Sequence, residues 1–266
     1  MTVIYFLFFD FNKAFDRVNY WKLFSHMLDD GVDTCYIRLL ALWFSKQTMC
    51  VPWHGHMSEK FLIGNDTRQG SILSPYLFTC YIRPLIQAVV QSRLGCNIGG
   101  LVVNILAYAD DMIILAPSWY AMQDLLKILK IHCHKHAIIC NIKKTVCMMF
   151  KPRRKDCIVS QAFPPFALNN DGLCYASEFR YLRHIINDRL QDDCDIWREI
   201  RSLFARTNLL INKFGKCSYM VKKLLLKSYC LSMYNLALWK YYTEQYLITL
   251  NRATTDVLKI LRVSKT

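Results

Sequence analysis

The sequence predicts an α+β fold in which a strand-containing N-terminal region precedes an all-helical C-terminal module. The first observation is a run without polar alternation, Val3–Phe9, which is typical of a strand buried on both faces. The second is a pair of apolar runs, 101–107 and 112–116, whose tight polar break is typical of a buried β-hairpin. The third is a change of period at Asp195, from which apolar residues recur at helical spacing. The two domains expected are residues 1–187 and 188–266.

Composition excludes a disordered chain and indicates a polyanionic partner. The 266 residues are 53% hydrophobic, which is enough for a sizeable core. Thirty-four lysines and arginines against 20 acidic residues give a net charge of +14, which favours nucleic acid first and an anionic membrane surface second. The 12 cysteines are irregularly spaced, so we expect mostly free thiols in a reducing, intracellular compartment. The apolar start lacks a basic leader, and no apolar run is long enough to span a membrane.

Start and stop signals place the other elements of the N-terminal region. Asp33 is a suitable N-cap for a helix through Phe44, and Ser74-Pro75 puts proline at the first position of another helix. Residues 47–63 are irregular and contain Pro and Gly, so we expect a loop or small hairpin there. Further helices are expected over residues 17–28, 74–91 and 119–136, and further strands over residues 146–150 and 179–186.

The C-terminal module is predicted to consist of three helices with a basic surface. The first ends at Gly215, and the second and third cover about 219–239 and 246–261. A basic loop, 151–155, is either a solvated surface or a phosphate contact, and charge runs are usually the former. The lysines that we expect to contact a nucleic-acid backbone are Lys216, Lys222, Lys223 and Lys227.

Three carboxylates stand at the ends of the predicted strands. Asp10 ends the first apolar run, and Asp110 and Asp111 form the polar break of the hairpin. Adjacent carboxylates between buried strands repel each other and are costly to desolvate, so a hard divalent cation would compensate them. The simpler interpretation is a helix cap at Asp10 and an Asp-rich turn in solvent. If one sheet brings the three together, they suit phosphoryl transfer, which uses two ions about 3.5–4 Å apart.

Five segments resemble, in order and spacing, motifs of the reverse transcriptases encoded by non-LTR (LINE-type) retrotransposons. Asp10–Asn19 resembles the first palm motif of that family, and Tyr108–Asp111 resembles its catalytic hairpin. These two motifs are the specific ones, and the resemblance extends over residues 3–187. The other matching segments are Arg68–Pro75, Lys143–Thr145 and, for the primer grip, Phe179–Ile185. The helical remainder resembles the family's thumb.

The resemblance implies a fold and an activity. The fold would be a right-hand polymerase palm, with an antiparallel, ferredoxin-like sheet packed by helices and residual fingers elements, followed by a helical thumb. The activity would be RNA-directed DNA polymerisation, in which two Mg²⁺ ions, or Mn²⁺ instead, support transfer from a dNTP to a primer 3′-hydroxyl. The partners would be an RNA template and a DNA primer, without a membrane, in a ribonucleoprotein of the nucleus or cytoplasm. The sequence leaves the oligomeric state open.

The resemblance also implies roles for individual residues. Metal ligands would be Asp10, Asp110, Asp111 and the backbone carbonyl of Phe11. Phe15 matches an aromatic gate that would clash with a 2′-hydroxyl and favour dNTPs, although a core phenylalanine is the simpler interpretation. The remaining nucleotide-binding residues would be Gln69, Gly70 and Lys144, and the primer grip would include Tyr181, Leu182 and Arg183.

The sequence departs from the family pattern in two places. Arg183 replaces a usual glycine, so the turn is strained if that position needs a positive φ. The chain also begins close to Asp10, which predicts a fragment without the family's fingers and endonuclease regions. We expect such a fragment to bind primer–template duplex but to polymerise poorly. The alternatives are a catalytically inactive nucleic-acid-binding remnant and a group II intron type reverse transcriptase.

Overall fold

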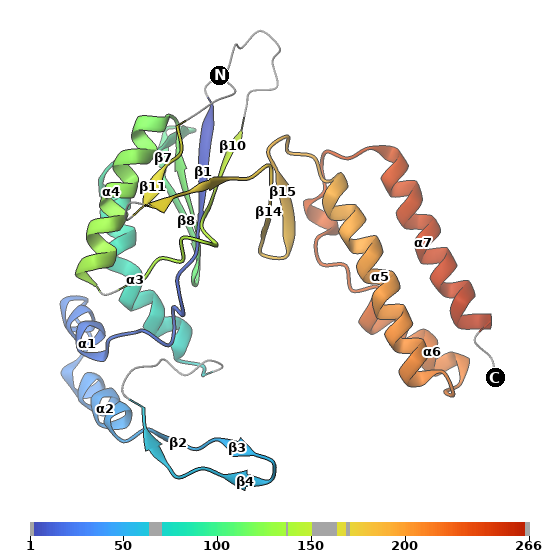
Figure 1. The fold of residues 1–266 in the computed structure, drawn as a ribbon, viewed down its shortest axis with the longest axis horizontal. Coiled ribbons are helices and arrows are strands. Elements are labelled where there is room, and N and C mark those ends of the chain that lie inside the picture. Colours follow the sequence, from blue (N-terminus) through green and yellow to red (C-terminus); the bar gives the residue numbers. More distant parts are fainter. Residues whose placement is uncertain (1–2, 64–70, 137, 151–163, 169–170, 264–266) are drawn as a thin grey trace. The chain divides into compact units, whose positions relative to one another are not determined.

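The structure is a computed structural model that describes residues 3–63, 71–136, 138–150, 164–168 and 171–263. It divides into two compact units, Met1–Ala176 and Ser177–Thr266 (Figure 1). The first unit contains a sheet with helices, and the second contains helices and one hairpin. This confirms the predicted α+β class. Packing groups the hairpin of residues 178–187 with the helices of the second unit, and the expected domain boundary after residue 187 stays a prediction.

The first unit is built on a five-stranded sheet with the strand order β13-β10-β1-β9-β8. Strand β1 lies in the middle and pairs antiparallel with both β9 and β10. Strand β13 joins the far edge as a parallel neighbour of β10. The strands are β1 (Ile4–Phe9), β8 (Ile105–Tyr108), β9 (Asp111–Ala116), β10 (Val146–Phe150) and β13 (Cys174–Tyr175). The central position of β1 explains its unbroken apolar run, because both of its faces are covered.

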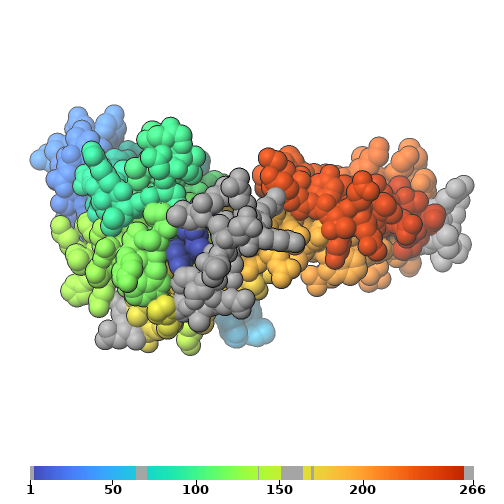
Figure 2. All heavy atoms as spheres, turned by 90° about the horizontal axis from the view of Figure 1, so that it is seen from above, coloured from blue at the N-terminus to red at the C-terminus, as the bar shows by residue number. Residues whose placement is uncertain are grey.

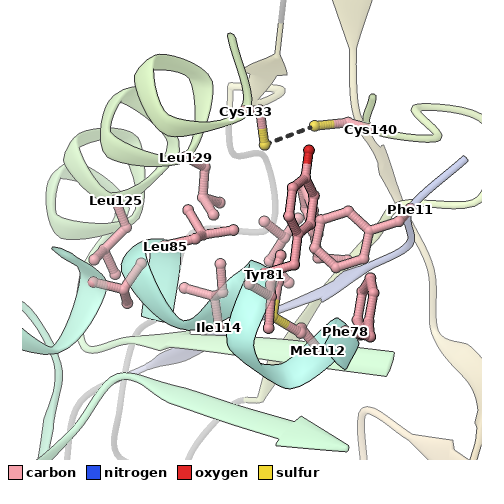
Figure 3. Packing of buried hydrophobic residues seen from close by; sticks show 14 of the residues in the cluster. Phe11, Phe78, Tyr81, Leu85, Met112, Ile114, Leu125, Leu129, Cys133 and Cys140 are labelled. Atoms are coloured by element: carbon pink, nitrogen blue, oxygen red, sulfur yellow. Dashed lines mark hydrogen bonds between the residues drawn. The ribbon is translucent and has the colours of Figure 1, made fainter. Parts of the chain in front are cut away.

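Helices α3 (Ser74–Gln91) and α4 (Trp119–Lys135) pack on the sheet. Alternate residues of β1 and β9, including Leu7 and Ile114, belong to one cluster with Leu85 of α3 and Leu125 of α4. Figure 3 shows Ile114, Leu85 and Leu125 packed together in this cluster. Every apolar side chain buried there contributes roughly 1.5–3 kcal/mol. A small dark blue patch of the N-terminal part of the chain is visible beside green residues in the space-filling view (Figure 2), and most residues of β1 are buried. The core therefore fixes β1 and β9 side by side.

Helices α1 (Tyr20–Asp29) and α2 (Thr34–Ser45) begin at side-chain caps. Asn19 accepts a hydrogen bond from the backbone N–H of Lys22, and Asp33 accepts one from Cys35 at 2.8 Å. Residues 47–63 form small hairpins, which confirms the hairpin rather than the loop of the two predicted alternatives. The paired short strands of this unit are β2 (Thr48–Met49) with β5 (Phe61–Leu62), β3 (Pro52–Trp53) with β4 (His56–Met57), β6 (Cys96–Ile98) with β7 (Leu101–Val103), and β11 (Ala167–Leu168) with β12 (Asp171–Gly172).

Two expected elements differ in the structure. The apolar run 101–107 is not one strand, because Asn104 is buried between β7 and β8 and donates a hydrogen bond to the carbonyl of Val89. The prediction of one helix over residues 219–239 is also wrong. This segment begins as the short helix α6 (Tyr219–Leu225) and continues as a π-helical turn, η1 (Leu226–Cys230). A separate 3₁₀ turn, η2 (Leu236–Leu238), follows. The Ser228 hydroxyl donates to backbone carbonyls of the preceding turn, a bond that competes with regular helix geometry.

The second unit packs two long helices, α5 (Asp193–Phe214) and α7 (Glu244–Val263), against each other. Their apolar stripes meet in a separate cluster that includes Ile200, Leu203 and Val257. The hairpin of β14 (Glu178–Tyr181) and β15 (His184–Asn187) contacts α5. In the described residues, none of the helices combines the length and apolarity that a membrane crossing requires.

Three histidines gather where α1 meets the C-terminal end of α4. The ring of His136 lies 4.9 Å from that of His26 and 5.6 Å from that of His132, between centroids. One buried nitrogen of each ring has no hydrogen-bond partner among the described residues. Burial lowers the pKa of all three histidines. For His136, burial together with the neighbouring imidazoles and Lys135 lowers the pKa to about 4.

This cluster should make the fold sensitive to acid. A pKa below the unfolded value of about 6.5 means that the stabilisation is complete above pH 6.5 and is lost as pH falls through 4. Because His136 is only 6% exposed, the loss should reach on the order of 3 kcal/mol. His136→Gln should flatten this part of the profile in urea unfolding between pH 7 and 4. The exposed His134 offers a control. If His134→Gln flattened the dependence of stability on pH as much as His136→Gln, the attribution of this acid sensitivity to His136 would be contradicted.

Candidate active site

Strand register brings the three predicted carboxylates to one end of the sheet. Phe9 of β1 faces Met112 of β9, so the next positions along the antiparallel pair are Asp10 and Asp111. Tyr108 of β8 faces Asp111, and Ala109 and Asp110 form the turn between these strands. Directly opposed residues of antiparallel strands have Cα atoms about 4.5–5.5 Å apart. Residues a hundred positions apart in sequence are thus neighbours at the end of two adjacent strands.

The carboxylates repel one another in the absence of a cation. Burial raises the pKa of the Asp111 carboxyl, and the charges of Asp110 and Asp10 raise it further, although Asp111 remains accessible to solvent. The Oδ2 atom of Asp10 is buried and has no hydrogen-bond partner in the described residues. A buried carboxylate oxygen without a donor is costly. A positively charged ligand at this point would relieve both the repulsion and the unsatisfied oxygen.

The donor set fits a hard divalent cation with few protein ligands. Within the part of the chain that the structure describes, no three His, Cys, Asp or Glu residues are placed to hold a metal ion by themselves. Mg²⁺ in phosphoryl-transfer sites is commonly held by one or two carboxylates, with water and phosphate oxygens filling the other positions. The open arrangement of Asp10 and Asp111 matches that kind of site rather than a closed protein cage.

The turn that carries Asp110 is strained. Ala109 has a φ of 53°, in the left-handed region that costs a residue with a Cβ about 1–2 kcal/mol. Two-residue hairpin turns favour a positive φ at their first central position. The strain therefore follows from the tight connection, which places Asp110 directly beside Asp111.

The backbone of Asp10 is fixed by the segment that follows α4. Its carbonyl accepts a hydrogen bond from Asn141 at 2.9 Å, and its N–H donates to the Thr145 hydroxyl at 3.3 Å. Phe11 forms an isolated antiparallel bridge with Cys140, and the two hydrogen bonds of that bridge use the Asp10 carbonyl and the Asn12 N–H rather than the Phe11 carbonyl. Thr145 is buried, and sequence reasoning assigned it no role of its own. The sequence signal that could have pointed to Thr145 was its position after two lysines, at the start of an apolar strand.

The predicted nucleotide-binding residues are described only in part. Phe15 is half-buried, and its ring centroid lies 4.8 Å from that of Phe78. Lys144 is exposed. Gln69 and Gly70 lie outside the described residues. Phe15 thus packs on α3 with one part of its ring while another part remains accessible, which leaves both of its predicted roles open.

The predicted nucleic-acid lysines do not all reach the surface. Lys216, Lys223 and Lys227 are exposed. Lys222 is only 2% exposed, so its expected phosphate contact is wrong for this structure. It occupies the buried side of the short helix α6, whose length and orientation the helical pattern did not predict. The basic loop 151–155 lies outside the described residues.

The turn of the predicted primer grip has two left-handed residues. Leu182 and Arg183 have φ values of 45° and 69°, between the paired residues Tyr181 and His184. Two-residue turns with both central φ values positive strongly prefer Asn-Gly. The sequence-based expectation of strain at Arg183 therefore has a structural basis.

Replacing this arginine by glycine should stabilise the protein. Arg183→Gly should raise the free energy of unfolding by about 1 kcal/mol, since glycine adopts a positive φ without steric cost. Arg180→Gly is a matched control, because Arg180 is an exposed residue of β14 without a positive φ. It should lower stability by about 0.5–1 kcal/mol. Urea unfolding would measure both changes in the free energy of unfolding. If both variants were stabilised, or both destabilised, the interpretation of Arg183 as a strained residue would be contradicted.

A buried polar network at the base of this hairpin was missed by sequence reasoning. Asp195 is fully buried and accepts hydrogen bonds from Arg198 Nε at 2.7 Å, Trp239 Nε1 at 2.9 Å and the Ile185 N–H at 3.0 Å. His184 Nδ1 lies 3.0 Å from Asp195 Oδ2, an ion-pair contact outside hydrogen-bond geometry. Burial alone would raise the pKa of Asp195, but these partners hold it below its usual range. The contact with Asp195 raises the pKa of His184 against the opposing effect of burial.

Comparison with known proteins identifies the family. Residues 2–186 match the protein family described as reverse transcriptase (RNA-dependent DNA polymerase). The chain belongs to the reverse transcriptase family. The match covers β1, the Asp110-Asp111 hairpin and β14, and it ends within β15, so the carboxylate end of this reverse transcriptase chain lies within it.

Two curated relatives are Pol polyproteins of retrotransposable elements. The chain is 26% identical to that of the type-2 element R2DM of Drosophila melanogaster over 117 residues, which are 44% of this chain and 11% of the relative. It is 25% identical to that of the type-1 element R2 of Popillia japonica over 181 residues, which are 66% of this chain and 25% of the relative. This reverse transcriptase chain therefore spans a small part of both relatives.

Solved telomerase structures show a weaker likeness. Apo telomerase from Candida tropicalis, truncated from its C-terminal domain, is 15% identical, with a TM-score of 0.49 over 70% of this chain and 34% of its own. Telomerase from Candida albicans, in complex with a fragment of telomeric RNA, is 10% identical, with a TM-score of 0.39 over 97% of this chain and 44% of its own. These values are too low to carry an argument about this chain.

Proposed function

We propose that the chain carries out RNA-directed DNA synthesis by transferring a nucleotide from a dNTP to a primer 3′-hydroxyl. The observation that carries this proposal is the register that sets Asp10 beside Asp111, with Asp110 in the adjoining turn. The orphaned Oδ2 of Asp10 and the raised pKa of Asp111 support a cation at this point. Family membership supports polymerisation as the chemistry that such a cation serves.

Each residue of the site has a distinct task in this proposal. Asp10, Asp110, Asp111 and the Phe11 carbonyl would hold two Mg²⁺ ions, or Mn²⁺ in their place. Divalent cations held there would supply charge stabilisation for the attacking 3′-hydroxyl and for the leaving pyrophosphate oxygen. Thr145 and Asn141 keep the Asp10 backbone in place through their hydrogen bonds. Lys144 presents an exposed ammonium that can balance the charge of pyrophosphate.

The partners follow from charge and family. A net charge of +14 suits a nucleic-acid duplex, and the exposed Lys216, Lys223 and Lys227 offer contacts to its phosphates. The template is RNA and the primer is DNA, and the source is a non-LTR retrotransposon, in line with the two relatives. A primer grip formed by Tyr181, Leu182 and Arg183 belongs to the same proposal.

Primer extension tests the proposed function. The chain is incubated with Mg²⁺ and labelled dTTP on poly(rA)/oligo(dT) and on poly(dA)/oligo(dT). We expect incorporation that requires the cation and is supported by the RNA template. No incorporation, together with salt-dependent binding of the same duplex, would instead identify a catalytically inactive nucleic-acid-binding remnant.

The sugar gate can be tested separately. Phe15→Ala should lower the ratio of kcat/KM for dTTP over UTP roughly tenfold to a hundredfold, because it opens space for a 2′-hydroxyl. Phe214→Ala is a suitable control, since Phe214 is an exposed ring of the second unit. If the ratio stays constant in Phe15→Ala while stability falls, Phe15 is a core residue and not a gate.

A further inference from the structure

Two free thiols are in contact behind the carboxylate end of the sheet. Cys133 lies in the last turn of α4 and is 4% exposed, and Cys140 is 8% exposed. Their sulfur atoms are 3.5 Å apart, and the two side chains point toward each other (Figure 3). A disulfide needs a sulfur separation of about 2.05 Å. The pair is therefore one small movement away from a covalent bond.

Cys140 belongs to the segment that holds Asp10. It forms an isolated antiparallel bridge with Phe11. On either side of this bridge, Asn12 N–H donates to the Ile139 carbonyl at 2.8 Å, and Asn141 N–H donates to the Asp10 carbonyl at 2.9 Å. Residues 139–141 thus act as a short extra strand along Asp10–Asn12. Any displacement of Cys140 is transmitted to the Asp10 backbone through these two hydrogen bonds.

Cys133 is anchored on the other side. Its carbonyl accepts a hydrogen bond from Ile138 N–H at 2.8 Å, which closes the end of α4. The helix is held by the main core through Leu125, Leu126 and Leu129. Because α4 is the better anchored partner, closure of a disulfide should move mainly the Cys140 segment, by roughly 1.5 Å.

We propose that Cys133 and Cys140 are a site of reversible oxidation by peroxide, and that their disulfide displaces the Asp10 segment. The oxidation itself is independent of the proposed polymerase function, whereas its effect on cation binding rests on that function. Hydrogen peroxide is small enough to reach a site of low exposure. The remaining cysteines of the described part of the chain provide internal references for accessibility, since Cys35 and Cys174 are exposed.

The chemistry balances with peroxide as the only co-reactant. One thiol sulfur attacks the O–O bond, which gives a sulfenic acid and releases one water. The second thiol sulfur then displaces the hydroxyl of the sulfenic acid, so the S–S bond forms and a second water leaves. The two thiol hydrogens end in the two waters, and peroxide is reduced while the sulfurs are oxidised. A dithiol reductant reverses the bond by exchange.

Peptide mapping tests the bond directly. Trypsin cleaves after Lys135, between the two cysteines, so a disulfide links peptide 131–135 to peptide 136–143. After peroxide treatment and blocking of free thiols, we expect this linked pair, with a mass lower by two hydrogens, and its loss after reduction. Cys133→Ala and Cys140→Ser should abolish it, and Cys96→Ser, at a buried cysteine of hairpin β6–β7, should keep it. Oxidation of Cys35 and Cys174 without this linkage would overturn the proposal.

Amide hydrogen exchange and Mn²⁺ binding test the consequence. In the oxidised protein, exchange at Asn12 and Asn141 should accelerate about tenfold or more, and Mn²⁺ affinity should fall roughly tenfold, as for other losses of support to a ligand. Both changes should be absent in Cys133→Ala. A disulfide with unchanged amides would overturn the displacement. Altered amides in a protein that binds no Mn²⁺ in either state would uphold the redox site and contradict the proposed function.

Discussion

Asp110→Asn should lower the turnover of RNA-templated DNA synthesis by about a thousandfold or more. The reason is that cation-borne charge stabilisation contributes several kcal/mol to the transition state of phosphoryl transfer. The same substitution should leave the cation-free fold as stable as before, or more stable, because the charge of Asp110 raises the pKa of Asp111. Steady-state primer extension and thermal unfolding without divalent cations measure the two effects.

A matched control is available on α4. Asp124 is an exposed carboxylate that pairs with Lys127, so Asp124→Asn should keep full activity. If Asp110→Asn retains turnover within threefold of the unmodified chain, the hairpin is an ordinary polar turn. Equal losses of turnover in both variants would indicate a nonspecific effect of charge.

Asp195→Ala should destabilise the second unit by about 3–5 kcal/mol. Its carboxylate is fully buried and is shared by Arg198, His184, Trp239 and the backbone of Ile185. Removing one partner of such a network leaves the others buried without compensation, which is the costly case. The free energy of unfolding in urea is the quantity to measure.

An exposed carboxylate of the same unit sets the baseline for that measurement. Asp256 forms an exposed pair with Lys259 on α7, and pairs of this kind contribute about 0.2–1 kcal/mol. Asp256→Ala should therefore have a small effect. Similar small losses in both variants would show that the network does not hold β15 and the Trp239 segment on α5.

Local signals were sufficient for the parts of the fold that depend on neighbouring residues in sequence. The unbroken run of β1 indicated a strand covered on both faces, and Asp33 and Ser74-Pro75 marked helix starts that the structure contains. The hairpin around Asp110 and Asp111 followed from two apolar runs and a tight break. The strain at Arg183 was expected from the resemblance, because glycine is usual at that position in the family, and Arg183 has a positive φ.

Features that depend on distant contacts were not accessible in this way. Asn104 interrupts an apolar run because its side chain reaches the Val89 carbonyl on α3. Lys222 is buried although its neighbours form a basic surface, since the short α6 turns that position inward. Asp195 looked like the start of a helical pattern, but its partners come from β15, α5 and the segment at Trp239. Each of these outcomes is decided by packing between residues far apart in sequence.

The most direct test of the carboxylate centre is anomalous diffraction from crystals grown with primer–template, a nonhydrolysable dNTP and Mn²⁺. We expect an anomalous peak within about 2.0–2.2 Å of the Asp10 Oδ2 atom and a carboxylate oxygen of Asp111, at the distances usual for hard divalent ions. A second peak should lie on the same group of carboxylates, toward the primer end. Ordered nucleotide without a peak at this end of β1 and β9, or Mn²⁺ bound at other residues, would contradict the assignment of this site to cation-assisted nucleotidyl transfer.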